Sequence, residues 1–353
     1  MRKESVALLK KMVETPSPSG FEQPVQKIVR AELKPFCDAV TTDVHGNVIG
    51  ALNPKGTPRV MLAGHCDEVG MMVTHIDDQG YLYFAAIGGV DGNLLPGLRL
   101  LVHGANGPVL GVVGRKPIHH MTAEDRKGEI KLESLWLDIG AKDKKDAQKS
   151  VAVGDPITYS PGFEVMPNDL ALSRGFDDKI GTFIVIETLR ALKKKKFPAA
   201  VFGVSTVQEE LGLRGAKTSA FGVEPDVGIA IDVGFASDWP GAEKKRIGEV
   251  KLGKGPILHR GANINPVVER RLSEAARKGK IPHQITAEPR GTGTDANAIQ
   301  MSRAGVAAGL ISIPNRYMHT PVEVVSLKDL DASVALIAET ILAMKGSESF
   351  IPH

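Results

Sequence analysis

The spacing of apolar residues predicts an α/β fold in the first and last parts of the chain. Apolar residues recur at helical spacing from Val6 to Val13, and the helix breakers from Pro16 to Gly20 end this segment. From about residue 177 onward, segments with helical spacing alternate with short apolar runs that are typical of buried strands. The predicted strands are 59–64, 199–206, 227–231 and 305–313, and the predicted helices include 179–192, 266–277 and 327–344. Helices that alternate with strands favour an α/β sheet.

The middle of the chain has a different pattern. Between about residues 70 and 165, short apolar runs alternate with turn signals such as Gly88-Gly89 and Pro96-Gly97. This pattern is typical of a small all-β unit. We therefore predict one α/β domain that is interrupted by a β insertion. A length of 353 residues, more than one ordinary core requires, fits this organisation.

The composition argues against several classes of function. Hydrophobic residues make up 42% and charged residues 24% of the chain, as in soluble globular proteins. The 44 basic and 41 acidic residues nearly balance and form no basic face, so we expect no nucleic-acid partner. No run approaches ~20 apolar residues, so we expect no membrane partner. Two cysteines do not make a disulfide framework, and we expect a cytoplasmic protein.

Imidazole and carboxylate side chains follow three of the predicted strands. These side chains are His65, Glu209, Glu210 and Asp232. Because ligands of open α/β sheets bind outside the carboxyl ends of the strands, we expect these groups to meet in one crevice. Together with Asp177 and His319 they match the donors of a two-metal site, in which one carboxylate bridges ions ~3.5–4 Å apart.

Each of these residues also has a simpler interpretation. His65 and His319 have the sequence context of surface or loop histidines, and Asp177-Asp178 has that of an ordinary helix cap. In the His65-x-Asp67 motif, the carboxylate is placed to hold the second ring nitrogen of the histidine. It is the order and context of the motifs, more than any one of them, that indicate a site.

In their order, the motifs resemble those of the TET-type metallo-aminopeptidases of metallopeptidase family 42. Members of this family are glutamyl or leucyl aminopeptidases, and some have been labelled endoglucanases. The resemblance extends over essentially the whole chain. The motifs are Gly64–Gly70 (GHCDEVG), Phe176–Gly181 (FDDKIG), Gln208–Gly212 (QEELG), Gly293–Ala296 (GTDA) and Arg316–Pro321 (RYMHTP).

The resemblance implies a fold and an assembly. Residues 1–69 and 166–353 would form a mixed-sheet α/β/α catalytic domain. Residues 70–165 would form an inserted all-β dimerisation domain, PDZ-like or barrel-like. We expect a homo-oligomer, either a dimer or dimers assembled into a tetrahedral dodecamer.

The resemblance also implies an aminopeptidase with two divalent metal ions per subunit, Zn²⁺ or Co²⁺, that acts on peptide substrates. His65 would bind one ion together with Glu210 or Asp232. His319 would complete the other ion's site, and Asp177 would bridge the two. The peptide bond between Asp177 and Asp178 is expected to be cis.

Four further residues have implied roles. Glu209 would be the general base, and Asp67 would support catalysis through His65. Thr294 and Asp295 would lie near the first side chain of the substrate, although Asp295 could equally cap a helix that begins there. The sequence assigns no role to the remaining His119, His120 and Cys66.

Two other functions stay open at this stage. A glycoside hydrolase also needs paired carboxylates, but two ligand-type histidines and an aromatic content of 5% disfavour it. A related metallohydrolase, either a deacylase or a carboxypeptidase, would need the same metal ligands.

Overall fold

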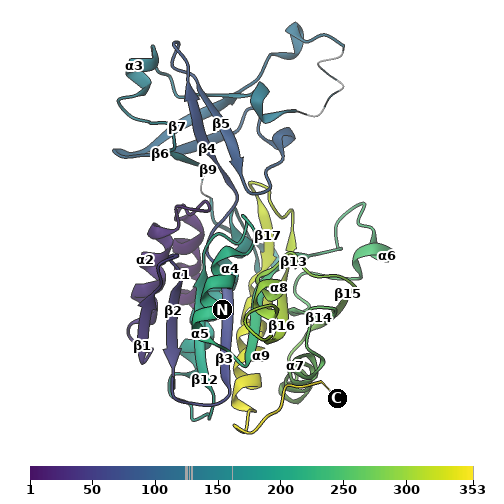
Figure 1. Cartoon of the computed structure of the whole chain (residues 1–353). Coiled ribbons are helices and arrows are strands. Elements are labelled where there is room, and N and C mark those ends of the chain that lie inside the picture. The colour runs from purple at the N-terminus through teal and green to yellow at the C-terminus, as the bar shows by residue number, and fades with distance from the viewer. Residues whose placement is uncertain (124–125, 127, 129, 161, 353) are drawn as a thin grey trace.

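The computed structural model describes residues 1–123, 126, 128, 130–160 and 162–352. In this part of the chain, an 11-stranded mixed sheet carries helices on both faces, and a closed barrel of six antiparallel strands lies beyond one end of it (Figure 1). The predicted α/β fold with a small β insertion is confirmed, and the insertion is barrel-like.

The large sheet has a parallel centre and antiparallel margins. Its order is β1-β2-β12-β3-β13-β16-β17-β11-β10, with β14 paired to β16 and β15 paired to β14. The four strands β12, β3, β13 and β16 run parallel. The strands are β1 (Ala39–Thr42), β2 (Val48–Leu52), β3 (Arg59–His65), β10 (Glu164–Met166), β11 (Leu170–Ser173), β12 (Ala200–Thr206), β13 (Val227–Phe235), β14 (Ile257–Gly261), β15 (Gln284–Glu288), β16 (Ala307–Arg316) and β17 (Glu323–Ser326).

Helices cover the two faces unequally. One face packs against α1 (Lys3–Glu14), α2 (Gln23–Leu33), α4 (Phe176–Leu192), α7 (Pro266–Gly279) and α9 (Leu327–Leu342). The other packs against α5 (Arg214–Val223) and α8 (Asp295–Gln300). Short helices are α3 (Lys144–Ala147) and α6 (Lys244–Ile247), and 3₁₀ turns are Gly92–Leu94, Ile118–His120, Leu132–Ser134 and Pro167–Asp169. Within the described residues, no helix combines the length and apolarity needed to cross a membrane.

The barrel is a separate unit with a core of its own. Its strand order is β4-β5-β8-β7-β6-β9. The strands are β4 (Gly70–Ile76), β5 (Leu82–Ile87), β6 (Arg99–Gly104), β7 (Gly107–Gly114), β8 (Trp136–Asp138) and β9 (Pro156–Tyr159). Leu82, Leu100 and Leu137 are fully buried inside it. The next strand, β10, already pairs with β11 in the large sheet, so the predicted boundary at 165 falls within β10.

Strand alternation places two of the predicted metal ligands on the same face of the sheet. Met61 and Ala63 of β3 pack on the side of α5 and α8, and His65 follows with the same period of two. Ala230 of β13 packs on that side too, and Asp232 follows it. The predicted end of this strand at residue 231 is wrong. Pairing with β16 continues to Phe235, so Asp232 lies inside the strand and not after it.

A buried ion cluster joins the N-terminal loop to the segment after β3. Glu68 is 3% exposed, pairs with Arg174, and lies 2.8 Å from Lys179 Nζ. Glu68 also accepts a hydrogen bond from the Ser17 amide (2.9 Å), while Lys179 donates to the carbonyl of Thr15 (2.8 Å). Burial by itself would raise the pKa of Glu68, but the two cations outweigh it and lower this pKa to about 2. The cluster therefore depends on an ionised Glu68.

We expect Glu68→Gln to lower the free energy of unfolding by about 3–5 kcal/mol, because it leaves two buried cations without their anion. Since the pKa of Glu68 is lowered from 4.5 to about 2, its contribution is complete above pH 4.5 and is lost as the pH falls toward 2. Urea unfolding of chelator-treated protein at several pH values measures both effects. The control is Glu249→Gln, which removes an exposed partner of Lys251 and should change nothing measurable. Equal stabilities of the two variants would contradict this account.

Candidate metal centre and active site

Six side chains with metal-binding or acid–base chemistry meet in one cavity at the carboxyl end of the parallel strands. The cavity has a volume of about 540 Å³. The residues that line it include His65, Asp177, Glu209, Glu210, Asp232 and His319. The structure thus brings together every residue that the sequence suggested as a metal ligand or general base. The sheet explains this, because the ends of neighbouring parallel strands share one edge.

Asp177 lies between the two histidines. Its Oδ1 is 3.2 Å from His65 Nε2, and its Oδ2 is 3.2 Å from His319 Nε2. Each carboxylate oxygen therefore faces a different imidazole. This is the arrangement that a bridging carboxylate requires.

The other two ligand candidates differ in which histidine they approach. Asp232 Oδ1 lies 3.9 Å from His65 Nε2, and Glu210 Oε1 lies 3.5 Å from His319 Nε2. Potential ligand atoms of His65, Asp177 and Glu210 also lie within 4.8 Å of one another. The geometry thus favours Asp232 beside His65 and Glu210 beside His319, with Asp177 common to both groups.

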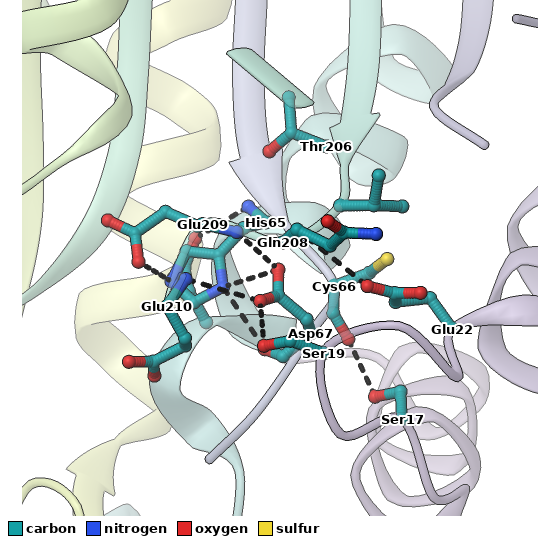
Figure 2. Close-up of polar contacts among 12 residues, drawn as sticks. Ser17, Ser19, Glu22, His65, Cys66, Asp67, Thr206, Gln208, Glu209 and Glu210 are labelled. Carbon is teal, nitrogen blue, oxygen red and sulfur yellow. Dashed lines mark hydrogen bonds and ion pairs between the residues drawn. The ribbon is translucent and has the colours of Figure 1, made fainter. Parts of the chain in front are cut away.

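Asp67 holds the backbone of the two adjacent glutamates (Figure 2). Its Oδ1 accepts a hydrogen bond from the Glu209 amide (3.1 Å), and its Oδ2 accepts one from the Glu210 amide (3.2 Å). The hydroxyl of Ser19 donates to the same Oδ2 (2.7 Å). Glu209 Oε2 then lies 3.7 Å from His65 Nε2. The two glutamates therefore face different histidines, as expected for different roles.

The second ring nitrogen of His65 has a nearer partner than the one that the sequence suggested. Nδ1 lies 3.1 Å from the backbone carbonyl oxygen of Asp67 and 3.4 Å from its carboxylate. The carboxylate is already engaged by Ser19 and by the amides of the two glutamates. Nδ1–H donation to the carbonyl leaves Nε2 of His65 facing the cavity.

Two carboxylates with structural roles were missed in the sequence. Glu323 accepts the amide of Asp177 (3.0 Å) through one oxygen and the amide of His319 (3.2 Å) through the other. Asp178 accepts the amide of His65 (3.1 Å), and the Asp177–Asp178 peptide bond is cis, as the resemblance implied. The available signal for Glu323 was one acidic residue in an otherwise apolar run, Val322–Val325.

The inserted barrel also reaches the site. The segment after β5 places the carbonyl oxygen of Gly89 3.1 Å from Nδ1 of His319. A β-carbon on Gly89 would lie 2.9 Å from that same nitrogen, and one on Gly88 would lie 3.3 Å from Glu210. A side chain at either position would therefore press against a candidate ligand, and Gly88 also has a positive φ of 74° that favours glycine.

The electrostatics of the cavity fit divalent cations. Burial raises the pKa of Glu209 to about 10 and that of Glu210 to about 8, and it also raises the pKa of Asp232. Among the residues that the structure describes, Glu210 Oε1 has no hydrogen-bond partner, although it is buried. Several carboxylates gathered in a buried place need positive charge, and carboxylate and imidazole are ligands that Zn²⁺ and similar ions accept. We conclude that the donor set suits a metal centre.

The other predicted residues lie in different positions. Thr294 lines the cavity, but Asp295 is not among its lining residues. The carboxylate of Asp295 is buried and accepts a hydrogen bond from the Thr206 hydroxyl (2.6 Å), and α8 begins at this residue. Cys66 is fully buried, which raises the pKa of its thiol and makes it unreactive. His119 and His120 are exposed in a short turn of the insertion.

Comparisons with known proteins agree on one family. Residues 46–336 match the family model described as M42 glutamyl aminopeptidase. A lysyl aminopeptidase of Pyrococcus furiosus is 39% identical over 342 residues, which cover 96% of this chain and 97% of that protein. A TET aminopeptidase of a marine sediment archaeon, Thaumarchaeota archaeon SCGC AB-539-E09, has a TM-score of 0.93 at 36% identity, with 97% of this chain and 96% of that chain covered. The TET1 peptidase of Pyrococcus horikoshii, described as assembling into a tetrahedron or a large octahedral shell, has a TM-score of 0.86 at 33% identity, with 96% and 100% covered.

We expect Gly89→Ala to weaken the binding of one of two divalent ions by about 10–100-fold, because the added methyl group displaces the ring of His319. Calorimetric titration of chelator-stripped protein with Zn²⁺ and with Co²⁺ measures this effect. The matched control is Gly222→Ala in α5, where an added β-carbon meets nothing within 4 Å. If both variants bind metal like the wild type, the contact between Gly89 and His319 does not support the metal centre.

Proposed function

Because the chain belongs to the M42 glutamyl aminopeptidase family and is therefore a peptidase, we propose that it removes amino acids from the N-termini of peptides with the help of two divalent cations. The observation that carries this proposal is the position of Asp177, whose two oxygens each lie 3.2 Å from a different histidine. A carboxylate so placed can bind two cations at once.

The residues divide naturally between the two cations. His65 and Asp232 would hold one, His319 and Glu210 would hold the other, and Asp177 would be shared. Zn²⁺ and Co²⁺ are the candidate ions, because both accept this mixture of imidazole and carboxylate. When bound, such cations lower the pKa of a water molecule and polarise a carbonyl group.

Glu209 is the proposed general base. Its carboxylate lines the cavity beside His65, and Asp67 holds its backbone in place. In this role Glu209 accepts a proton from the attacking water and later delivers it to the amine that leaves the scissile bond. The positive charge of the centre would keep Glu209 ionised before the reaction, since nearby cations lower the pKa that burial raises.

We also propose that the chain forms oligomers through its barrel. Leu110 (53% exposed) and Val112 (46% exposed) lie on the outer face of β7. They are two residues apart in the strand, so their side chains point to the same side. Exposed neighbouring apolar side chains suit contact with a second copy of the chain. Dimers formed in this way are the units from which a tetrahedral dodecamer would be built.

We expect Glu209→Gln to retain two metal ions and to lose most of its turnover, because the amide keeps the shape of the side chain but cannot accept the proton. The loss should be about 10²–10⁴-fold in kcat, the usual contribution of a general base. Glu210→Gln should instead lose metal. Metal content, measured by mass spectrometry after gel filtration, and hydrolysis of aminoacyl-p-nitroanilides distinguish the two outcomes. N-acetylated substrates should not be cleaved. Near-normal turnover of Glu209→Gln would refute the assignment of the base.

We expect the double variant Leu110→Glu, Val112→Glu to shift the chain toward monomers, because burying two carboxylates in an apolar contact is unfavourable. Sedimentation velocity measures the distribution of species. Val153→Glu is a suitable control, since Val153 is exposed (63%) in the barrel region but lies outside β7. An unchanged distribution in the double variant would exclude this face as the contact.

A further inference from the structure

The cavity continues beyond the metal ligands, and this second part is walled by the margin of the sheet. β14 and β15 contribute His259, Thr286 and Glu288, and the segment 291–294 closes another side. The apolar residues Phe235, Ile257 and Leu310 line the same space. It is therefore a recess with both apolar and polar walls, and it belongs to the same cavity as the candidate metal centre.

His259 forms a rigid part of the wall. Its Nε2 is 2.9 Å from the hydroxyl of Ser312, and its Nδ1 is 3.0 Å from the hydroxyl of Thr286. The side chain is only 7% exposed. Ser312 pairs in register with Asp232 on the neighbouring strand, so the wall and the metal centre are built on the same rigid strands. Groups attached to this wall keep a fixed position relative to the reacting atoms.

Glu288 places a negative charge on this wall. Its Oε1 lies 3.6 Å from Nδ1 of His259, and the carboxylate both lines the cavity and remains 39% exposed. The neighbouring imidazole of His259 lowers the pKa of Glu288, so the group is ionised at neutral pH. The contact with His259 thus gives Glu288 a defined position, and its exposed part faces the cavity.

Arg246, a second charged group beside this part of the cavity, is less constrained. Arg246 on α6 is 82% exposed, and its ion-pair partner Glu243 is 3.9 Å away and 73% exposed. The charge of a side chain so exposed to bulk water is strongly screened. The wall of the recess is therefore dominated by the charge of Glu288.

We propose that this recess receives the side chain of the substrate's first residue and that Glu288 selects a cationic side chain, lysine or arginine. This inference rests on the proposed aminopeptidase function. The apolar lining would cover the methylene groups of such a side chain, and the carboxylate would pair with its charged end. Glu288 is thus a specificity-determining residue that takes no part in the proton transfer.

The test compares the wild type with Glu288→Gln on p-nitroanilides of lysine, arginine, leucine and glutamate. We expect kcat/KM for lysine and arginine to fall by about 10–100-fold, mainly through KM, because a hydrogen bond between charged partners is lost. The value of kcat/KM for leucine p-nitroanilide should change by less than about threefold. Glu288→Lys should reverse the order of lysine and glutamate. The control Glu243→Gln should leave all four values unchanged, and the metal content of each variant should equal that of the wild type.

The possible failures are distinguishable. If the wild type cleaves none of the four substrates, the proposed function fails and this inference fails with it. If the wild type cleaves them but Glu288→Gln keeps the same ratio of lysine to leucine, only the inference is overturned. A wild-type preference for glutamate that disappears in Arg246→Gln would overturn it too, because the arginine would then set the specificity.

Discussion

The site depends on one constraint, which is that several carboxylates must lie together in a place from which water is largely excluded. Asp177 is at its centre, with one oxygen toward His65 and the other toward His319. Isolated negative charges in such a place are expensive, and the raised pKa values of Glu209, Glu210 and Asp232 reflect that cost. Bound cations would offset this free-energy cost of burying the carboxylates. The proposed metal centre is therefore the simplest physical reason for this cluster.

The surrounding fold holds these groups by their backbones. Asp67 accepts the amides of Glu209 and Glu210, and Glu323 accepts those of Asp177 and His319. Each of these two carboxylates thus joins a pair of site residues, and neither takes up a ligand position itself. Such pairing fixes the backbone from which each side chain extends and so limits where its functional group can lie, as a preorganised site requires. The contact from Gly89 extends the same support to the inserted barrel.

Much of the site could be predicted from the sequence, because it follows from strand geometry. His65 and Asp232 lie on one face by strand alternation, and Glu209 and Glu210 follow a recognisable buried strand. The role of Glu323 could not be predicted in this way. Its partners are 146 and 4 residues away, and the more distant one, Asp177, reaches Glu323 because β17 pairs with β11, where Glu323 lies opposite Ser173. The wall formed by His259 and Glu288 depends likewise on β14 and β15 adding to the sheet at β16.

The most direct test of the central claim is anomalous diffraction from crystals of the unmodified protein grown with Zn²⁺ or Co²⁺. The account predicts two strong peaks, one on either side of the Asp177 carboxylate, with His65 nearest to one peak and His319 nearest to the other. Both peaks should disappear from crystals soaked in chelator. A single peak, or two peaks that do not share Asp177, would contradict the proposed two-metal centre.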